Sequence, residues 1–265
     1  MPGPSADVLV AITREVSPAL AACELTHQPR VAIDAARATT QHRAYVDLLA
    51  RLGCRVIELK AEPDLPDSVF VEDTAVVLDE VAVITRPGAA SRRPECRSIA
   101  SALSDHRPVV ALTEPATLDG GDVLFDGSVL WVGLSGRTNG EGLAQLSEIA
   151  KRHGLDTRAV ALRDCLHLKS AVTLVAPDTL LLAPRWVDAD VFAGRDIVRV
   201  DSAEPGAANA LRVGTDIVYP ACFPRTRERL EARGIAVHDV DVSELQKAEG
   251  AVTCCSLVFR AAAGM

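Results

Sequence analysis

Aromatic residues are scarce in this chain, because two tryptophans, two tyrosines and five phenylalanines make up only 3% of its 265 residues. So few rings leave little material for a base-stacking platform or an aromatic cage. Positive charge is also in deficit, since 28 Lys and Arg stand against 36 Asp and Glu and give a net charge of −8. A chain of this sign is not attracted to phosphate backbones, so we expect no nucleic-acid partner.

Long apolar runs are absent as well. No stretch approaches the roughly 20 residues of a membrane span, and the segment from Met1 to Asp7 lacks the basic and apolar regions of a secretion signal. The seven cysteines are an odd number, which does not suit a disulfide framework, so most of them are expected to be small buried side chains in a reducing compartment. These absences predict a cytoplasmic protein with no membrane partner.

The remaining composition is that of an ordinary globular protein. Hydrophobic residues make up 48% of the chain and charged residues 24%, which is enough apolar material for a large core. No stretch rich in Pro, Gly and Ser has the character of an interdomain linker. We therefore expect residues 1–265 to form a single domain.

Hairpin patterns recur along the chain. Short β-branched runs separated by turn residues occur at 75–79 with 81–85, 122–125 with 128–132, 170–175 with 179–182, and 208–213 with 216–219. A fifth hairpin would join 253–259 to the N-terminal segment 7–12. The starting points lie 38 to 48 residues apart, and this spacing favours five units closed into a ring over an irregular α/β domain.

Amphipathic segments with apolar residues three or four apart separate these hairpins. They predict helices that end before Gly53 and Gly154, a helix around 99–103, a helix over 225–233 before Gly234, and a short one after Trp186. The segment 18–30 is rich in small and polar residues and is the best candidate for a mobile loop.

Acidic residues gather in two segments. Pro66 to Asp73 contains Asp67, Glu72 and Asp73 around a short apolar run, and a carboxylate pair can hold a planar guanidinium in forked geometry; a solvated loop is the ordinary alternative. Residues 117–122 read TLDGGD, where paired glycines allow close approach of the backbone. This segment lacks the basic residue of a phosphate loop, and a plain hairpin turn is its alternative.

A histidine and a cysteine pair complete the unusual positions. His167 enters a predicted strand between Leu166 and Leu168 and is either catalytic or a core residue; no second ligand pair accompanies it, which disfavours zinc. Cys254 and Cys255 stand at the head of the last predicted strand, where alternation sends their side chains to opposite faces. One thiol is therefore a candidate nucleophile, and two inert cysteines are the alternative.

A closed ring would bring these positions together, because each lies at the start of a successive unit. A thiol, an imidazole and several carboxylates suit attack by a thiolate on a carbon that already carries positive charge.

Several motifs in this order resemble the dimethylarginine dimethylaminohydrolase family, within the guanidino-group-modifying superfamily that also contains arginine deiminase. The similarity covers most of the chain. It includes Gln41-His42 with Tyr45, PDSVFVED at 66–73, ITRPGAASRR at 84–93, ATLDGGDVLF at 116–125, VGLSGRTN at 132–139, LHLKS at 166–170 and LQKAEGAVTCCS at 245–256.

The resemblance implies a five-bladed α/β-propeller of ββαβ-like units. It also implies hydrolysis of Nω-methylated L-arginines, a small-molecule substrate class, to L-citrulline and a methylamine, with no cofactor and no metal. A deiminase-like enzyme acting on unmethylated arginine and a catalytically silent arginine-binding protein are the alternatives. The oligomeric state, monomer or homodimer, stays open.

The same resemblance assigns roles to individual residues. Cys254 corresponds to the nucleophile, His167 to the general acid and base, and Asp119 to the carboxylate that orients the imidazole. Substrate binding falls to three groups of residues: Asp73, Glu72 and Asp67 for the guanidinium, Arg92 and Arg137 for the α-carboxylate, and the backbone carbonyls near Leu25 and Ala248 for the α-ammonium.

Overall fold

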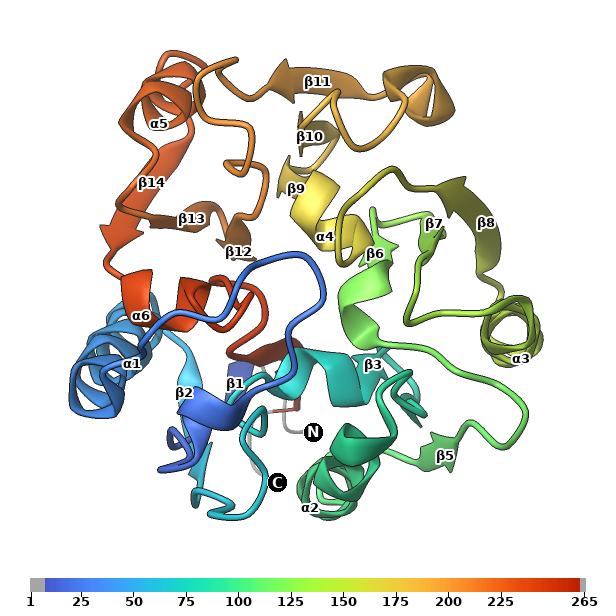
Figure 1. Cartoon of the computed structure of the whole chain (residues 1–265). Coiled ribbons are helices and arrows are strands. Elements are labelled where there is room, and N and C mark those ends of the chain that lie inside the picture. Colours follow the sequence, from blue (N-terminus) through green and yellow to red (C-terminus); the bar gives the residue numbers. More distant parts are fainter. Residues whose placement is uncertain (1–7, 263–265) are drawn as a thin grey trace, which may run out of the picture.

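Five three-stranded β-sheets surround a central axis in the computed structural model, which describes residues 8–262 (Figure 1). In each sheet the middle strand pairs antiparallel with one neighbour and parallel with the other. The sheets are β15 (Leu257–Ala261), β1 (Val8–Arg14) and β2 (Arg55–Leu59); β3 (Ala75–Val77), β4 (Ala82–Ile84) and β5 (Val109–Ala111); β6 (Val123–Phe125), β7 (Val129–Leu134) and β8 (Asp156–Ala161); β9 (Val172–Ala176), β10 (Thr179–Leu182) and β11 (Asp196–Arg199); and β12 (Leu211–Val213), β13 (Asp216–Pro220) and β14 (Ala236–Val240).

Each sheet with its crossover helix is one ββαβ unit. An antiparallel pair can be joined by a tight turn, whereas a parallel pair needs a longer crossover. The crossovers run through α1 (Ala35–Arg51), α2 (Cys96–Ser104), α3 (Gly140–Arg152), α5 (Pro224–Glu231) and the 3₁₀ turn η5 (Ala189–Phe192), all of which lie outside the ring of sheets (Figure 1). The chain is therefore a five-bladed α/β-propeller, as predicted.

Local signals explain where the crossover helices begin and end. The side chain of Asp34 accepts the backbone N–H of Arg37 at the start of α1, and Asn139 caps α3 in the same way. Gly53 and Gly154 follow α1 and α3 with φ of +90° and +73°, a conformation that glycine adopts without strain. The predicted glycine stops are confirmed.

One blade is built from both ends of the chain. Strand β15 pairs antiparallel with β1, with Val8 opposite Ala261 and Ile12 opposite Leu257, so the ring closes through hydrogen bonds between segments about 250 residues apart. This confirms the predicted fifth hairpin, although Asp7 lies outside the described residues. Apolar residues fill the space between blades; for example, Ile99 and Leu103 of α2 share a buried cluster with strands of two blades.

Three strand boundaries differ from prediction. Residues 168–171 form the one-turn helix α4 (Leu168–Ala171), so His167 precedes a helix and does not enter a strand. Residues 252–255 form a turn before β15, so the cysteine pair does not stand in the strand, and β12 begins only at Leu211. Backbone that must bend toward the axis cannot continue a sheet ladder, and an apolar run does not reveal that bend.

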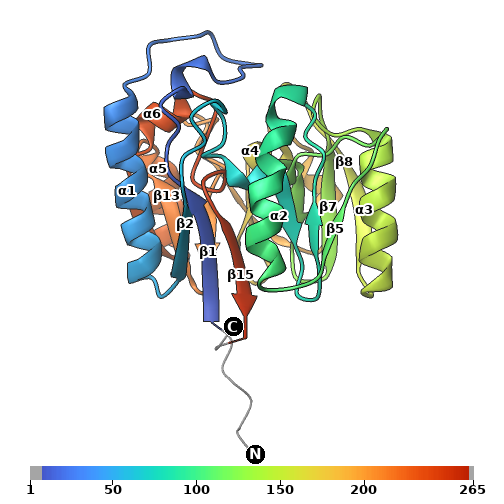
Figure 2. The ribbon, with the colours of Figure 1, turned by 90° about the horizontal axis from the view of Figure 1, so that it is seen from below.

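The two ends of the propeller differ. The loop of residues 23–34, which we call the lid, lies at the end opposite to Val8 and Ala261 (Figure 2). It follows the 3₁₀ turn η1 (Leu20–Ala22), and it overlaps the segment 18–30 that was predicted to be a loop. Among the described residues, no helix combines the length and the apolar character needed to cross a bilayer.

Candidate active site

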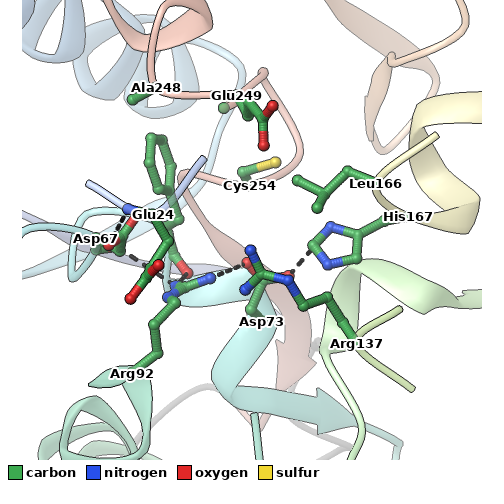
Figure 3. A pocket seen from close by; sticks show the side chains of 12 residues that line it. Glu24, Asp67, Asp73, Arg92, Arg137, Leu166, His167, Ala248, Glu249 and Cys254 are labelled. Atoms are coloured by element: carbon green, nitrogen blue, oxygen red, sulfur yellow. Dashed lines mark hydrogen bonds and ion pairs between the residues drawn. The ribbon is translucent and has the colours of Figure 1, made fainter. Parts of the chain in front are cut away.

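A pocket opens beside the lid, where connections from several blades meet (Figure 3). Part of its lining comes from the 3₁₀ turns η2 (Val71–Thr74) and η3 (Ala90–Glu95), from His167 before α4, and from the turn that follows the short helix α6 (Ser243–Gln246). The 3₁₀ turn η4 (Gly120–Asp122) packs against η2 and α4. The lining residues are Glu24, Asp67, Phe70, Asp73, Arg92, Arg137, Leu166, His167, Ala248, Glu249, Gly250 and Cys254. Most of the residues predicted for the site therefore share one cavity.

His167 is held between two carboxylates. Its Nε2 lies 3.0 Å from Asp119 Oδ2, and its Nδ1 lies 3.7 Å from Asp73 Oδ1. The other oxygen of Asp119 accepts the Gly88 N–H at 2.9 Å. Burial lowers the pKa of His167, but Asp73, Asp119 and Asp122 outweigh this effect and raise it to about 9. The imidazole is therefore protonated at neutral pH.

The paired glycines allow this close arrangement. A Cβ atom on Gly121 would lie 2.6 Å from His167 Nδ1 and 2.8 Å from Asp73 Oδ1, and one on Gly120 would lie 2.0 Å from the Glu72 carbonyl oxygen. The Gly121 N–H donates to Asp73 Oδ1 at 3.1 Å. The prediction that these glycines permit close backbone approach is confirmed.

Asp73 and Arg92 form a buried ion pair, with Arg92 Nη1 2.5 Å from Asp73 Oδ2. Burial opposes ionisation of Asp73, yet His167 and Arg92 lower its pKa to about 2. Asp73 is therefore ionised at neutral pH on the floor of the pocket. Each of its carboxylate oxygens has a further lone pair that can accept a hydrogen bond from a bound cation.

Arg92 is almost fully occupied by protein partners. Its Nε and Nη2 donate to the two carboxylate oxygens of Glu95 at 3.2 and 2.9 Å, and Nη2 also donates to the Phe70 carbonyl at 3.0 Å. With the Asp73 contact, one Nη1 hydrogen has no partner among residues 8–262. Arg137 is less enclosed, because its guanidinium is partly exposed. It donates a hydrogen bond to Thr26 Oγ1 of the lid at 2.8 Å.

Cys254 lies in the turn before β15 with its side chain at the pocket, and its neighbour Cys255 is fully buried in the core (Figure 3). The two thiols thus point to different environments, as predicted, although a turn and not strand alternation separates them. Burial and the charges of Glu72 and Asp73 raise the pKa of the Cys254 thiol far above its usual range. Without a ligand, the sulfur is protonated.

Glu72 does not line this pocket. Its carboxylate accepts from Lys169 Nζ at 2.7 Å and from Thr253 Oγ1 at 2.7 Å, and these three residues line a second cavity toward the opposite end of the axis. Glu72 remains next to the site through its backbone, because its N–H donates to the Cys254 carbonyl at 3.1 Å. The structure therefore places this carboxylate beneath the pocket and not in it.

The lid is fastened over the pocket by a carboxylate that was not predicted. Glu249 accepts the backbone N–H groups of Thr26, His27 and Gln28 at 2.9, 2.6 and 2.6 Å. Glu249 has φ of +58°, an uncommon conformation for a residue with a side chain. Glu249 lies between Ala248 and the turn at 252–255, so these hydrogen bonds join the lid to the segment that carries Cys254.

The other predicted residues at the lid lie on its two sides. Asp67 Oδ2 accepts the Glu24 N–H at 3.0 Å, which places Asp67 beside the lid. Ala248 is buried and lines the pocket. Leu25 packs against the neighbouring apolar cluster, and Glu24, the residue before it, lines the cavity instead.

Several residues in and around the site were not predicted from the sequence, among them Glu95, Glu249 and Asp122. Glu95 stands three residues after Arg92, a spacing that pairs charges on a helical turn and was the available signal. Glu249 and Asp122 gave no such signal, because their partners are distant in the sequence or lie on the backbone.

Ligand atoms of Asp73, Asp119 and His167 lie within 4.8 Å of one another, a spacing that a metal ion could bridge. A metal ligand must be a neutral imidazole, whereas the raised pKa keeps His167 protonated. A metal ion would therefore have to displace this proton in order to bind here.

Comparison with known proteins agrees with this geometry. The family model described as "N,N dimethylarginine dimethylhydrolase, eukaryotic" matches residues 24–201. An N(G),N(G)-dimethylarginine dimethylaminohydrolase of Streptomyces coelicolor is 39% identical over 94% of this chain and 96% of its own, and that of Pseudomonas aeruginosa is 37% identical over 85% and 90%.

The solved structures include a similar fold. A cysteine-to-serine variant of the Pseudomonas aeruginosa DDAH, complexed with citrulline, superposes with a TM-score of 0.91 at 35% identity, covering 95% of this chain and 99% of that one. The chain therefore belongs to the dimethylarginine dimethylaminohydrolase family.

Proposed function

We propose that this protein is a dimethylargininase that hydrolyses Nω,Nω-dimethyl-L-arginine and Nω-monomethyl-L-arginine to L-citrulline and dimethylamine or methylamine. The observation that carries the proposal is the single pocket that gathers a thiol at Cys254, a protonated imidazole at His167 and a permanent carboxylate at Asp73. Membership of the family and the citrulline bound to a similar structure support the same substrate class.

Substrate binding activates the nucleophile. The thiol of Cys254 is protonated in the free enzyme because burial and neighbouring carboxylates disfavour the thiolate. A guanidinium held against Asp73 brings positive charge next to the sulfur and stabilises the thiolate, and the thiol proton leaves to solvent. The substrate therefore helps to ionise the group that attacks it.

The first chemical step forms a covalent intermediate. The thiolate adds to the guanidinium carbon, and His167 gives its proton to the substituted nitrogen, because an amine leaves poorly as an anion. The C–N bond breaks, neutral dimethylamine departs, and an S-alkylthiouronium remains on Cys254. Asp119 holds the ring through Nε2 and stabilises its charge before the transfer.

Hydrolysis then releases the product. His167 is now neutral and takes a proton from a water molecule, whose oxygen adds to the thiouronium carbon. Collapse breaks the C–S bond and expels the Cys254 thiolate. The proton that remains on the oxygen derived from water passes to the Cys254 thiolate. This leaves the ureido group of citrulline, with the Cys254 thiol and His167 both protonated for the next cycle.

The other end of the substrate sets its length. We assign the α-carboxylate to Arg137 and to the remaining Nη1 hydrogen of Arg92, and the α-ammonium to the backbone carbonyls near Leu25 and Ala248, with Asp67 beside them. Glu72 supports the floor below Asp73. A ligand that lacks the carboxylate loses the arginine contacts, which selects against decarboxylated analogues.

We further propose one catalytic domain in the cytoplasm. Pairing of β1 with β15 and the origin of the site in several blades support a single unit. The seven cysteines are free thiols, which supports a reducing compartment. Whether the unit is a monomer or a homodimer is a question for sedimentation analysis.

The test is citrulline release by the purified protein from dimethyl-L-arginine and, in parallel, from L-arginine. We expect the methylated substrate to be preferred, Cys254→Ser to abolish turnover while still binding substrate, and Cys255→Ala, which changes the adjacent thiol, to retain it. Turnover of arginine alone would move the assignment to a deiminase. Binding of both ligands without citrulline would indicate a silent member of the fold.

A further inference from the structure

Asp122 is a buried carboxylate that does not contact the pocket and has no role in the mechanism above. It lies at the end of η4, directly before β6, and is 0% exposed. Its oxygens accept three hydrogen bonds from two segments, the start of α4 and the loop between β7 and α3. These bonds lead to three residues of the site.

The first segment carries the acid and base. Asp122 Oδ1 accepts the backbone N–H of Leu168 at 2.9 Å, and Leu168 follows His167 in the sequence. This N–H belongs to the first residue of α4, where no partner within the helix is available. Asp122 therefore fixes the backbone from which the imidazole projects.

The second segment, the loop between β7 and α3, contacts the partner of the imidazole. Thr138 Oγ1 donates to Asp122 Oδ2 at 2.7 Å and accepts the Asp119 N–H at 3.2 Å. The hydroxyl thus bridges the two aspartates. Because Asp119 is the carboxylate that contacts His167, this bridge sets the position of that carboxylate relative to the ring.

The same loop carries the substrate-binding arginine. Ser135 Oγ donates to Asp122 Oδ2 at 2.5 Å and accepts the Arg137 N–H at 3.0 Å. The loop between β7 and α3 is therefore anchored at Ser135 and at Thr138, with Arg137 between them. Movement of this anchor would move the guanidinium at the pocket.

We propose that Asp122 is the positioning residue of the site, which sets His167, Asp119 and Arg137 relative to one another. All three of its partners are donors, so an acceptor with a full charge satisfies them together. A displacement of about 1 Å at a reacting group can cost about 100-fold in rate. This inference rests on the function proposed above.

The chain contains a matched control at the other end of the same strand. Asp126 directly follows β6, is 3% exposed, and accepts from the backbone of Ser128 and Val129 and from Trp131 Nε1. It is nearly as buried as Asp122 and has more partners, including an ion pair with Arg195 at 2.7 Å, but none of these partners belongs to the site. If Asp122 were purely structural, its loss would harm catalysis no more than the loss of Asp126.

The experiment compares Asp122→Asn with Asp126→Asn. We expect kcat/KM for dimethyl-L-arginine to fall about 10- to 100-fold in Asp122→Asn and to stay near the wild-type value in Asp126→Asn. Thermal stability should fall at least as much in Asp126→Asn, because this change also breaks the ion pair with Arg195. The pKa of His167, followed by NMR of the imidazole, should fall only in Asp122→Asn, because only this change removes a negative charge near the ring.

Two further variants each remove one hydrogen bond to Asp122, and they test the proposal even if Asp122→Asn does not fold. Thr138→Val loosens Asp119 and should chiefly lower kcat, whereas Ser135→Ala loosens Arg137 and should chiefly raise KM. Three results would each overturn the proposal. They are an equal loss of kcat/KM in Asp122→Asn and Asp126→Asn, an unchanged His167 pKa in Asp122→Asn, and wild-type kinetics in both Thr138→Val and Ser135→Ala.

Failure of the proposed function would look different. If the wild-type protein released no citrulline, the kinetic comparison would be void, but the His167 titration needs no turnover. A fall in the His167 pKa in Asp122→Asn, without one in Asp126→Asn, would show even then that Asp122 acts on the imidazole and is more than a structural residue.

Discussion

Replacing Asp119 with asparagine tests the charge arrangement around His167. The pKa of His167 is about 9 against an ordinary value of 6.5, a difference worth about 3 kcal/mol. Burial acts in the opposite direction, so the neighbouring carboxylates supply the whole of it. The hydrogen bond from His167 Nε2 to Asp119, at 3.0 Å, is charge-assisted and contributes about 1.5 to 3 kcal/mol. Its loss should lower the pKa of His167 by about 1 to 2 pH units.

The pH dependence of kcat/KM reports this pKa. In the free enzyme the Cys254 thiol loses its proton at higher pH than His167 does, so the form with a thiolate and an imidazolium is a minor one. Its fraction rises about tenfold per pH unit until His167 begins to deprotonate, and then levels off. We expect kcat/KM of the wild-type enzyme to level off near pH 9, and that of Asp119→Asn to level off about 1 to 2 units lower.

A carboxylate beside a different histidine provides the control. Glu80 contacts His153 Nδ1 at 2.7 Å on the surface, so Glu80→Gln removes a similar pair away from the site and should leave the profile unchanged. NMR titration of the His167 ring in the same variants checks the assignment. A wild-type profile already level at pH 7, or a ring pKa that Asp119→Asn leaves in place, would refute the reasoning.

Three further predictions follow from the same geometry. The raised pKa of His167 stabilises the fold below pH 6.5 by about 3 kcal/mol, a contribution that is lost as pH rises through 9; urea unfolding of wild type and His167→Gln should show their difference shrinking over this range, and a constant difference would contradict it. Gly121→Ala places a Cβ 2.6 Å from the imidazole and should lower kcat, whereas Gly136→Ala meets no atom within 4 Å and should be silent; equal kcat in the two variants would argue against steric contact. Arg92→Ala strands two buried carboxylates and should cost roughly 3 to 5 kcal/mol of stability, whereas Arg137→Ala should raise KM with unfolding unchanged; equal stability of the two variants would contradict the buried ion pair.

The blades could be predicted from the sequence because their signals are local. Turn residues between β-branched runs, caps such as Asp34 and stops such as Gly53 act within a few residues, so their spacing along the chain revealed five repeated units. The short helix α4 and the turn at 252–255 were placed in strands, because the direction in which backbone leaves a sheet depends on what it packs against.

The identity of the chemical groups was also available from the sequence. The motifs around Cys254, His167 and Asp119 resemble those of one family, and the structure brings all three to the lid end of the axis. The position of the Glu72 carboxylate could not be predicted from its motif. Its motif is shared with Asp73, but Lys169 and Thr253, distant in sequence, hold its carboxylate below the pocket.

The sequence by itself predicted which residues carry the chemistry, since side-chain type and local turn signals need no tertiary contact. Only the tertiary structure decided how those residues are charged and held. Burial and partners brought together by closure of the ring decide four features. These are the protonation of His167, the ion pair of Arg92 with Glu95, the hydrogen bonds from the lid to Glu249, and the hydrogen bonds that Asp122 accepts. Charge and hydrogen bonding act through distance in space, and that distance is set when β15 joins β1 and completes the propeller.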